Sequence, residues 1–117
     1  MQTQELIEKY LGFLKKDYNF EYSWSNKRGT IYLFENKYGS IKYYEWQQFN
    51  EKEFSIIIEN QIKTIDFKIE YPEKYAEYLK SRKSIFKDSK DFFWKMVSDI
   101  IKEEIEKKGN IFGLRLY

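Results

Sequence analysis

Two residue types that carry much of enzyme chemistry are absent, because the 117 residues include no cysteine and no histidine. Without cysteine, a disulfide framework, a thiolate zinc site and a thiol nucleophile are all excluded. Without histidine, the chain lacks the usual general base near neutral pH and the commonest metal ligand. The five glycines form no phosphate-binding loop of the P-loop type. Any catalysis would therefore depend on carboxylate, lysine, tyrosine or hydroxyl groups, and we expect no cofactor.

Long apolar runs are missing as well. The longest ones, such as Ile56-Ile57-Ile58, are far shorter than a membrane-spanning helix. Met1 to Glu5 have neither the basic segment nor the apolar core of a signal peptide. We therefore expect no membrane partner and, by default, a cytoplasmic protein.

The charges nearly cancel, with 21 basic and 19 acidic residues and a net charge of +2. This balance argues against a dedicated nucleic-acid binder, whose affinity comes largely from neutralising phosphates. Aromatic residues are abundant, with 11 Tyr, 10 Phe and 3 Trp beside a single Pro. This composition is typical of an AT-rich genome, and it would also suit a binding surface. The length predicts one domain, residues 1–117.

Three segments have the three-and-four spacing of apolar residues that is typical of amphipathic helices. They cover residues 3–16, 72–83 and 89–108. In the second, we expect Tyr75, Ala76 and Leu79 to be buried. In the third, Glu104 falls within the apolar arc, and we expect it to be solvated and paired with Lys108.

Five further segments are predicted as strands, from alternation of apolar and polar residues and from β-branched or aromatic content. They are residues 20–24, 30–34, 41–46, 54–59 and 65–70. The tail, 111–117, is expected to be a short final strand that closes the sheet or pairs with another chain. The predicted fold class is α+β: a mostly antiparallel sheet of about five strands, with an N-terminal helix and two C-terminal helices covering one face.

Asp66 and Lys68 would share one face of the strand 65–70, and Glu59 lies on the preceding strand. Nucleases that hold Mg²⁺ between acidic residues, beside a strand lysine, need such an arrangement. The Pro-Asp element that accompanies it in those enzymes is missing. The alternative is an ordinary solvated strand face, which we favour, so no metal ligand is assigned.

A basic stretch joins the last two predicted helices and contains Ile85 and Phe86. It could contact phosphates around an apolar anchor, or it could be an ordinary charged connection. The candidate phosphate contacts are Lys80, Arg82, Lys83, Lys87 and Lys90.

The middle strands carry more large rings than one face can bury. If Ile41 and Tyr43 face the helices, then Tyr44 and Trp46 face outward. Exposed Tyr and Trp beside charges are typical of protein-binding hot spots. The candidate partner-binding residues are Tyr32, Tyr44 and Trp46.

The order of features resembles that of the small immunity proteins encoded beside bacterial polymorphic toxins. The resemblance rests on residues 11–20, a helix running into a strand, and on the strand segments 33–41 and 54–58. It implies stoichiometric blocking of a cognate toxin, with no catalysis by this chain. Immunity proteins that act on nucleases often carry a marked acidic charge, and the near-neutral balance here departs from that pattern.

The sequence therefore favours a non-catalytic protein-binding module with a protein partner, such as a toxin that it blocks sterically. A nucleic-acid-associated accessory protein acting through the basic stretch is the first alternative. A carboxylate enzyme dependent on Mg²⁺ is the second.

Overall fold

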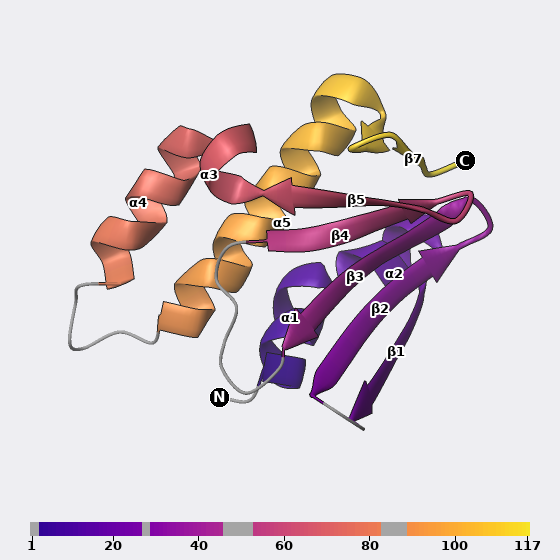
Figure 1. Cartoon of the computed structure of the whole chain (residues 1–117), viewed down its shortest axis with the longest axis horizontal. Helices are drawn as coiled ribbons and strands as arrows, with labels where there is room; N and C mark the ends of the chain where they lie inside the picture. Colours follow the sequence, from indigo (N-terminus) through magenta and orange to yellow (C-terminus); the bar gives the residue numbers. More distant parts are fainter. Residues whose placement is uncertain (1–2, 27–28, 46–52, 83–88) are drawn as a thin grey trace.

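The computed structural model describes residues 3–26, 29–45, 53–82 and 89–117. Its centre is an antiparallel five-stranded sheet in which the strands follow the chain in the order β1-β2-β3-β4-β5 (Figure 1). The helices α1, α2 and α5 lie behind this sheet in the view of Figure 1. The predicted α+β class, the antiparallel sheet and the N-terminal and C-terminal helices are thus confirmed. The strands are β1 (Glu21–Asn26), β2 (Thr30–Asn36), β3 (Gly39–Glu45), β4 (Glu53–Ile58) and β5 (Gln61–Asp66).

The first predicted helix is present but divided. Helix α1 (Thr3–Leu11) ends one residue before Gly12, and α2 (Phe13–Tyr18) follows directly. Asn19 ends α2 in the left-handed region, with φ of 57°, and its N–H donates to the carbonyl of Leu14. The chain then turns into β1.

Two tight turns set the registers of β2–β3 and β4–β5. Asn36 Oδ1 accepts from the backbone N–H groups of Tyr38 and Gly39, at 2.9 and 3.1 Å, as in an Asx turn. Glu59 and Asn60 both have positive φ, 52° and 67°, which is the two-residue turn favoured in hairpins. Gly39 must be glycine, because a Cβ there would lie 2.1 Å from the carbonyl oxygen of Ile57.

The predicted strand 65–70 is wrong from Phe67 onward. The strand ends at Asp66, and residues Phe67–Glu70 form the short helix α3. The carboxylate of Asp66 accepts a 2.9 Å hydrogen bond from the N–H of Lys68, which caps this helix. Phe67 enters the core, whereas Ile69 is left 75% exposed.

Helices α4 (Pro72–Arg82) and α5 (Ser89–Lys108) confirm the two C-terminal helices. In α4 the core-facing rings are Tyr75 and Tyr78, whereas Ala76 is exposed and Leu79 is half-buried. The expectation for Ala76 was wrong because α4 turns its two tyrosines toward α5, where Tyr78 contacts Phe93.

After α5, the chain folds back as a small hairpin of β6 (Asn110–Ile111) and β7 (Leu114–Arg115), which form a two-stranded sheet of their own. The single final strand predicted for 111–117 is therefore wrong. Phe112 and Gly113 form the turn of the β6–β7 hairpin, with φ of 51° and 93°. Leu114 is fully buried, and β7 contacts β3 and β4.

The core lies between the sheet and the helices and is rich in rings. Phe93 of α5 contacts Tyr43 of β3, Phe67 and Tyr78, with ring centroids 5.7 to 6.0 Å apart. Trp94 meets Tyr43 edge-on at 4.7 Å. Much of the aromatic surplus is therefore core packing. No helix in the described ranges is both long and apolar enough to cross a lipid bilayer.

Candidate functional site

The two faces of the sheet differ in burial. Along each strand, side chains alternate between the helix side and the opposite side. On the helix side, the central strands bury Tyr32, Phe34, Ile41, Tyr43 and Ile56 to 6% exposure or less. The residues between them point the other way, toward the viewer in Figure 1, where no described element covers the strands.

We call this second side the open face. Its side chains come from all five strands, and every one of them except Ser40 is at least partly exposed. The members are Glu21, Ser23, Ser25, Ile31, Leu33, Glu35, Ser40, Lys42, Tyr44, Glu53, Ser55, Ile57, Ile62, Thr64 and Asp66.

Apolar side chains meet in cross-strand pairs on the open face. Ile31 lies opposite Tyr44, and Ile57 lies opposite Ile62. Tyr44 is 41% exposed and Ile62 is 68% exposed. Directly opposite pairs have Cβ atoms about 5 Å apart, so each pair is a continuous apolar contact area. Each of the two pairs thus leaves apolar area accessible on the open face.

The strand register also places charged side chains of the open face directly opposite one another, and in each pair the two charges have the same sign. Glu21 lies opposite Glu35, and Glu53 lies opposite Asp66. Like charges directly opposite one another destabilise an antiparallel sheet. Lys42 is the one basic residue among the open-face members, so this face is acidic although the whole chain has a net charge of +2. In the second pair the Asp66 carboxylate also caps α3, so its charge has a role in the fold.

The three sequence-derived binding residues have different outcomes. Tyr44 lies on the open face, whereas its neighbour in the chain, Tyr43, lies on the helix side. This is the orientation that alternation along the strand from Ile41 predicts. Tyr32 is only 6% exposed and packs against Tyr43 in the core, so it is not an anchor. Trp46 lies outside the described residues. Sequence reasoning missed Ile62, because the second strand of the β4–β5 hairpin was expected to begin only at residue 65.

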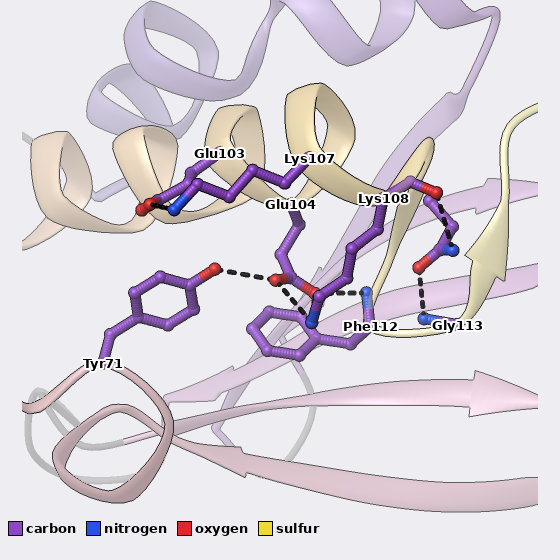
Figure 2. A network of polar contacts seen from close by, with 8 residues as sticks. Tyr71, Glu103, Glu104, Lys107, Lys108, Phe112 and Gly113 are labelled. Atoms are coloured by element: carbon purple, nitrogen blue, oxygen red, sulfur yellow. Dashed lines mark hydrogen bonds and ion pairs between the residues drawn. The ribbon is translucent and has the colours of Figure 1, made fainter.

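Glu104 was expected to be solvated, but it is 2% exposed (Figure 2). Its Oε2 accepts a 2.7 Å hydrogen bond from the hydroxyl of Tyr71 and lies 3.0 Å from Nζ of Lys108. Its Oε1 accepts from the backbone N–H of Phe112 at 3.1 Å. The expected pair with Lys108 is confirmed, whereas the solvation is wrong because Tyr71 and the turn of the β6–β7 hairpin close over the carboxylate.

This network ties the C-terminal hairpin to α5 and to Tyr71. Burial is the main cause that raises the pKa of Tyr71 above its usual range, and the hydrogen bond to Glu104 adds to it. A phenol with a raised pKa stays protonated at neutral pH and keeps donating to the carboxylate. The contacts of Glu104 are thus occupied by groups of the chain itself.

The arrangement proposed for a Mg²⁺ site is not formed. Asp66 ends β5 opposite Glu53, whereas Glu59 lies in the turn at the other end of that hairpin. Five residues of strand separate the two ends, or about 17 Å. Lys68 belongs to α3 and does not share a strand face with Asp66. Within the described ranges, no group of three acidic side chains could hold a metal ion.

The basic stretch is described only at its two ends. Lys80 is exposed on α4, and Arg82 is the last residue of that helix. Lys90 lies in the first turn of α5, with its Nζ 3.4 Å from the hydroxyl of Thr3. Lys83 and Lys87 lie outside the described residues, as do Ile85 and Phe86. The phosphate contacts of this stretch therefore stay a prediction.

An open hollow of about 590 Å³ lies where α2, the β2–β3 turn and the C-terminal segment meet. Asn36 is among its lining residues, but its side chain is engaged with Tyr38 N–H, Gly39 N–H and the carbonyl of Arg115. The ring of Tyr38 is covered by the guanidinium of Arg115 at 4.5 Å. These contacts hold the walls of the hollow together, and the Glu21–Glu35 pair of the open face also lines it.

Comparisons of the chain with protein families, with curated proteins and with solved structures find no match. The open face is therefore judged on its own geometry and chemistry.

Proposed function

We propose that this chain is a non-catalytic protein-binding module that docks a partner protein on the open face of its sheet. The observation that carries the proposal is the pairing of exposed Tyr44 with Ile31, and of exposed Ile62 with Ile57, on the uncovered side of the sheet. Large apolar side chains grouped in this way, with charges around them, suit a partner's complementary surface.

The charge of the open face indicates what the partner offers. The Glu21–Glu35 and Glu53–Asp66 pairs would be neutralised by basic side chains on either side of an apolar contact. The two pairs lie on opposite corners of the face, about 20 Å apart from strand spacing and rise. Such charges raise the association rate and exclude partners of the wrong sign.

The resemblance to immunity proteins gives the proposal its finer form, in which the partner is a toxin and binding blocks it sterically. This form needs no catalytic residue in the chain. It agrees with a carboxylate network around Glu104 that serves the fold alone.

The test is affinity capture of the tagged protein from native lysate after nuclease treatment, read by quantitative mass spectrometry. The wild type is compared with Tyr44→Ala and Ile62→Ser, and with Ile69→Ser as the matched control. Ile69 is 75% exposed on α3, so its substitution removes similar apolar area outside the open face.

We expect one protein in stoichiometric amount, retained by the wild type and by Ile69→Ser and released by Tyr44→Ala and Ile62→Ser. Equal retention by all four proteins would contradict the proposal. Loss of the captured material on nuclease treatment alone would favour the nucleic-acid alternative instead.

A further inference from the structure

Strand β1 is an edge of the sheet. It is six residues long, or about 20 Å, and pairs with β2 on one side only. Figure 1 shows it as the outermost strand at the lower right, with no labelled element beyond it. An edge strand presents unpaired N–H and C=O groups that can pair with another chain.

The side chains of β1 include few of the features that protect an edge. Its register with β2 runs unbroken from Glu21 to Asn26, so there is no bulge. It contains no proline and no basic residue, and Glu21 is its only charge. The other edge, β5, carries Lys63 on the helix side of the sheet, and an inward-pointing charge is a known protective device.

Trp24 gives the edge an apolar contact as well. It lies opposite buried Tyr32, on the helix side of the sheet, and is nevertheless 48% exposed. Tyr22, on the same side of β1, stacks on Phe34 with ring centroids 4.7 Å apart. About half of the Trp24 side chain is therefore accessible at the edge of the sheet.

We propose that β1 pairs antiparallel with β1 of a second copy of this chain, which joins the two sheets into one. A two-fold axis relates the two strands. Residues directly opposite one another must point to the same side of the joined sheet, so this axis passes between a residue and the same residue of the second copy. With Ser23 opposite Ser23 of the second copy, Tyr22 faces Trp24 of the second copy, and Glu21 faces Ser25. No like charges meet in this register, and both exposed Trp24 rings gain an aromatic neighbour.

The symmetry of this contact is a two-fold axis, so the same edge serves both copies. The two open faces then lie side by side on the same side of the joined sheet. The contact is distinct from the docking proposed above, since it is made by the backbone edge of β1 and not by the side chains of Tyr44 and Ile62. Because a single strand pair buries a small area, we expect a weak, concentration-dependent dimer.

The chain has no cysteine, so a single introduced cysteine can form a disulfide only with the same cysteine of a second copy of the chain. We would oxidise Ser23→Cys and, as the matched control, Thr64→Cys, an exposed open-face position on the other edge strand. Opposite residues in antiparallel strands have Cα atoms about 4.5–5.5 Å apart, which suits a disulfide. Sedimentation of the wild type over a concentration series, with and without Ser23→Lys, gives a second measurement.

We expect a dimer that grows with concentration in the wild type, rapid covalent dimer in Ser23→Cys, and none above background in Thr64→Cys. Ser23→Lys should be monomeric, because two lysines would then meet at the axis. A wild type that stays monomeric at every concentration overturns the proposal. Cross-linking of Thr64→Cys as fast as Ser23→Cys overturns it too.

Discussion

The hydroxyl of Tyr71 donates a 2.7 Å hydrogen bond to the carboxylate of Glu104, although 33 positions separate the two residues in the chain. The same carboxylate accepts from the N–H of Phe112. One buried side chain of α5 thus holds both the junction of α3 with α4 and the C-terminal hairpin (Figure 2). The relationship therefore serves the packing of α5 against these two parts of the chain.

Glu104→Ala should destabilise the chain by about 2–4 kcal/mol, because it leaves the Tyr71 hydroxyl and the Phe112 N–H buried without an acceptor. Glu104→Gln keeps an acceptor and should cost less. Glu106→Ala, at an exposed position of the same helix, is the control. Chemical denaturation measures the free energy of unfolding, and equal losses for Glu104→Ala and Glu106→Ala would show that the network contributes nothing.

Stability should fall as pH rises above about 10. Burial raises the pKa of Tyr22 and of Tyr71 above the usual value. At alkaline pH the folded chain therefore binds more protons than the unfolded chain, and the free energy of unfolding decreases with pH. Thermal midpoints between about pH 9 and pH 11 measure this slope.

Tyr71→Phe should make the alkaline decrease shallower, because it removes one of the phenols whose pKa burial raises. Tyr117→Phe, at a position that is 77% exposed, is the matched control. A slope that is identical in both variants would contradict the role assigned to Tyr71.

Gly39→Ala should destabilise the sheet by about 1–3 kcal/mol or more, since its Cβ would lie 2.1 Å from the carbonyl of Ile57 and 2.9 Å from Cδ1 of Leu114. Gly109→Ala is the comparison, because space is free there and only the backbone at φ of 74° resists a side chain. We expect the larger loss at Gly39, measured by denaturation. A larger loss at Gly109 would mean that β3 and β4 can separate at little cost.

Asp66→Ala should cost about 0.5–2 kcal/mol by removing the cap of α3, and Asp66→Asn should cost less because its amide oxygen can still accept from Lys68 N–H. Denaturation of the two variants checks this order. The reverse order would indicate that the charge of Asp66, and not its hydrogen bond, matters to the fold.

Local periodicity in the sequence predicts the helices and strands. The prediction fails where a contact with a residue distant in the chain determines the local structure. Alternation along β3 predicted that Tyr44 faces outward if Ile41 and Tyr43 face the helices, and the structure has these three side chains so arranged. Residues 30–34 are apolar at nearly every position, so alternation could not say whether Tyr32 faces inward. The register with Tyr43 decides it.

The other errors have the same origin. Residues 65–70 alternate as a strand should, but the side chain of Asp66 captures a backbone N–H and starts a helix. Glu104 lies on an apolar arc, and no residue near it in the sequence indicates that Tyr71 is its hydrogen-bond partner. Within the open face, alternation identified Tyr44, whereas its acidic pairs became visible only with the register.

The most direct test of the central claim is side-chain footprinting of the chain, alone and in complex with the partner that it captures. Four exposed apolar residues report: Tyr44 and Ile62 on the open face, and Ile69 and Tyr117 elsewhere. We expect Tyr44 and Ile62 to lose labelling in the complex while Ile69 and Tyr117 keep it. Protection of Ile69 and Tyr117, with Tyr44 and Ile62 still labelled, would contradict the account.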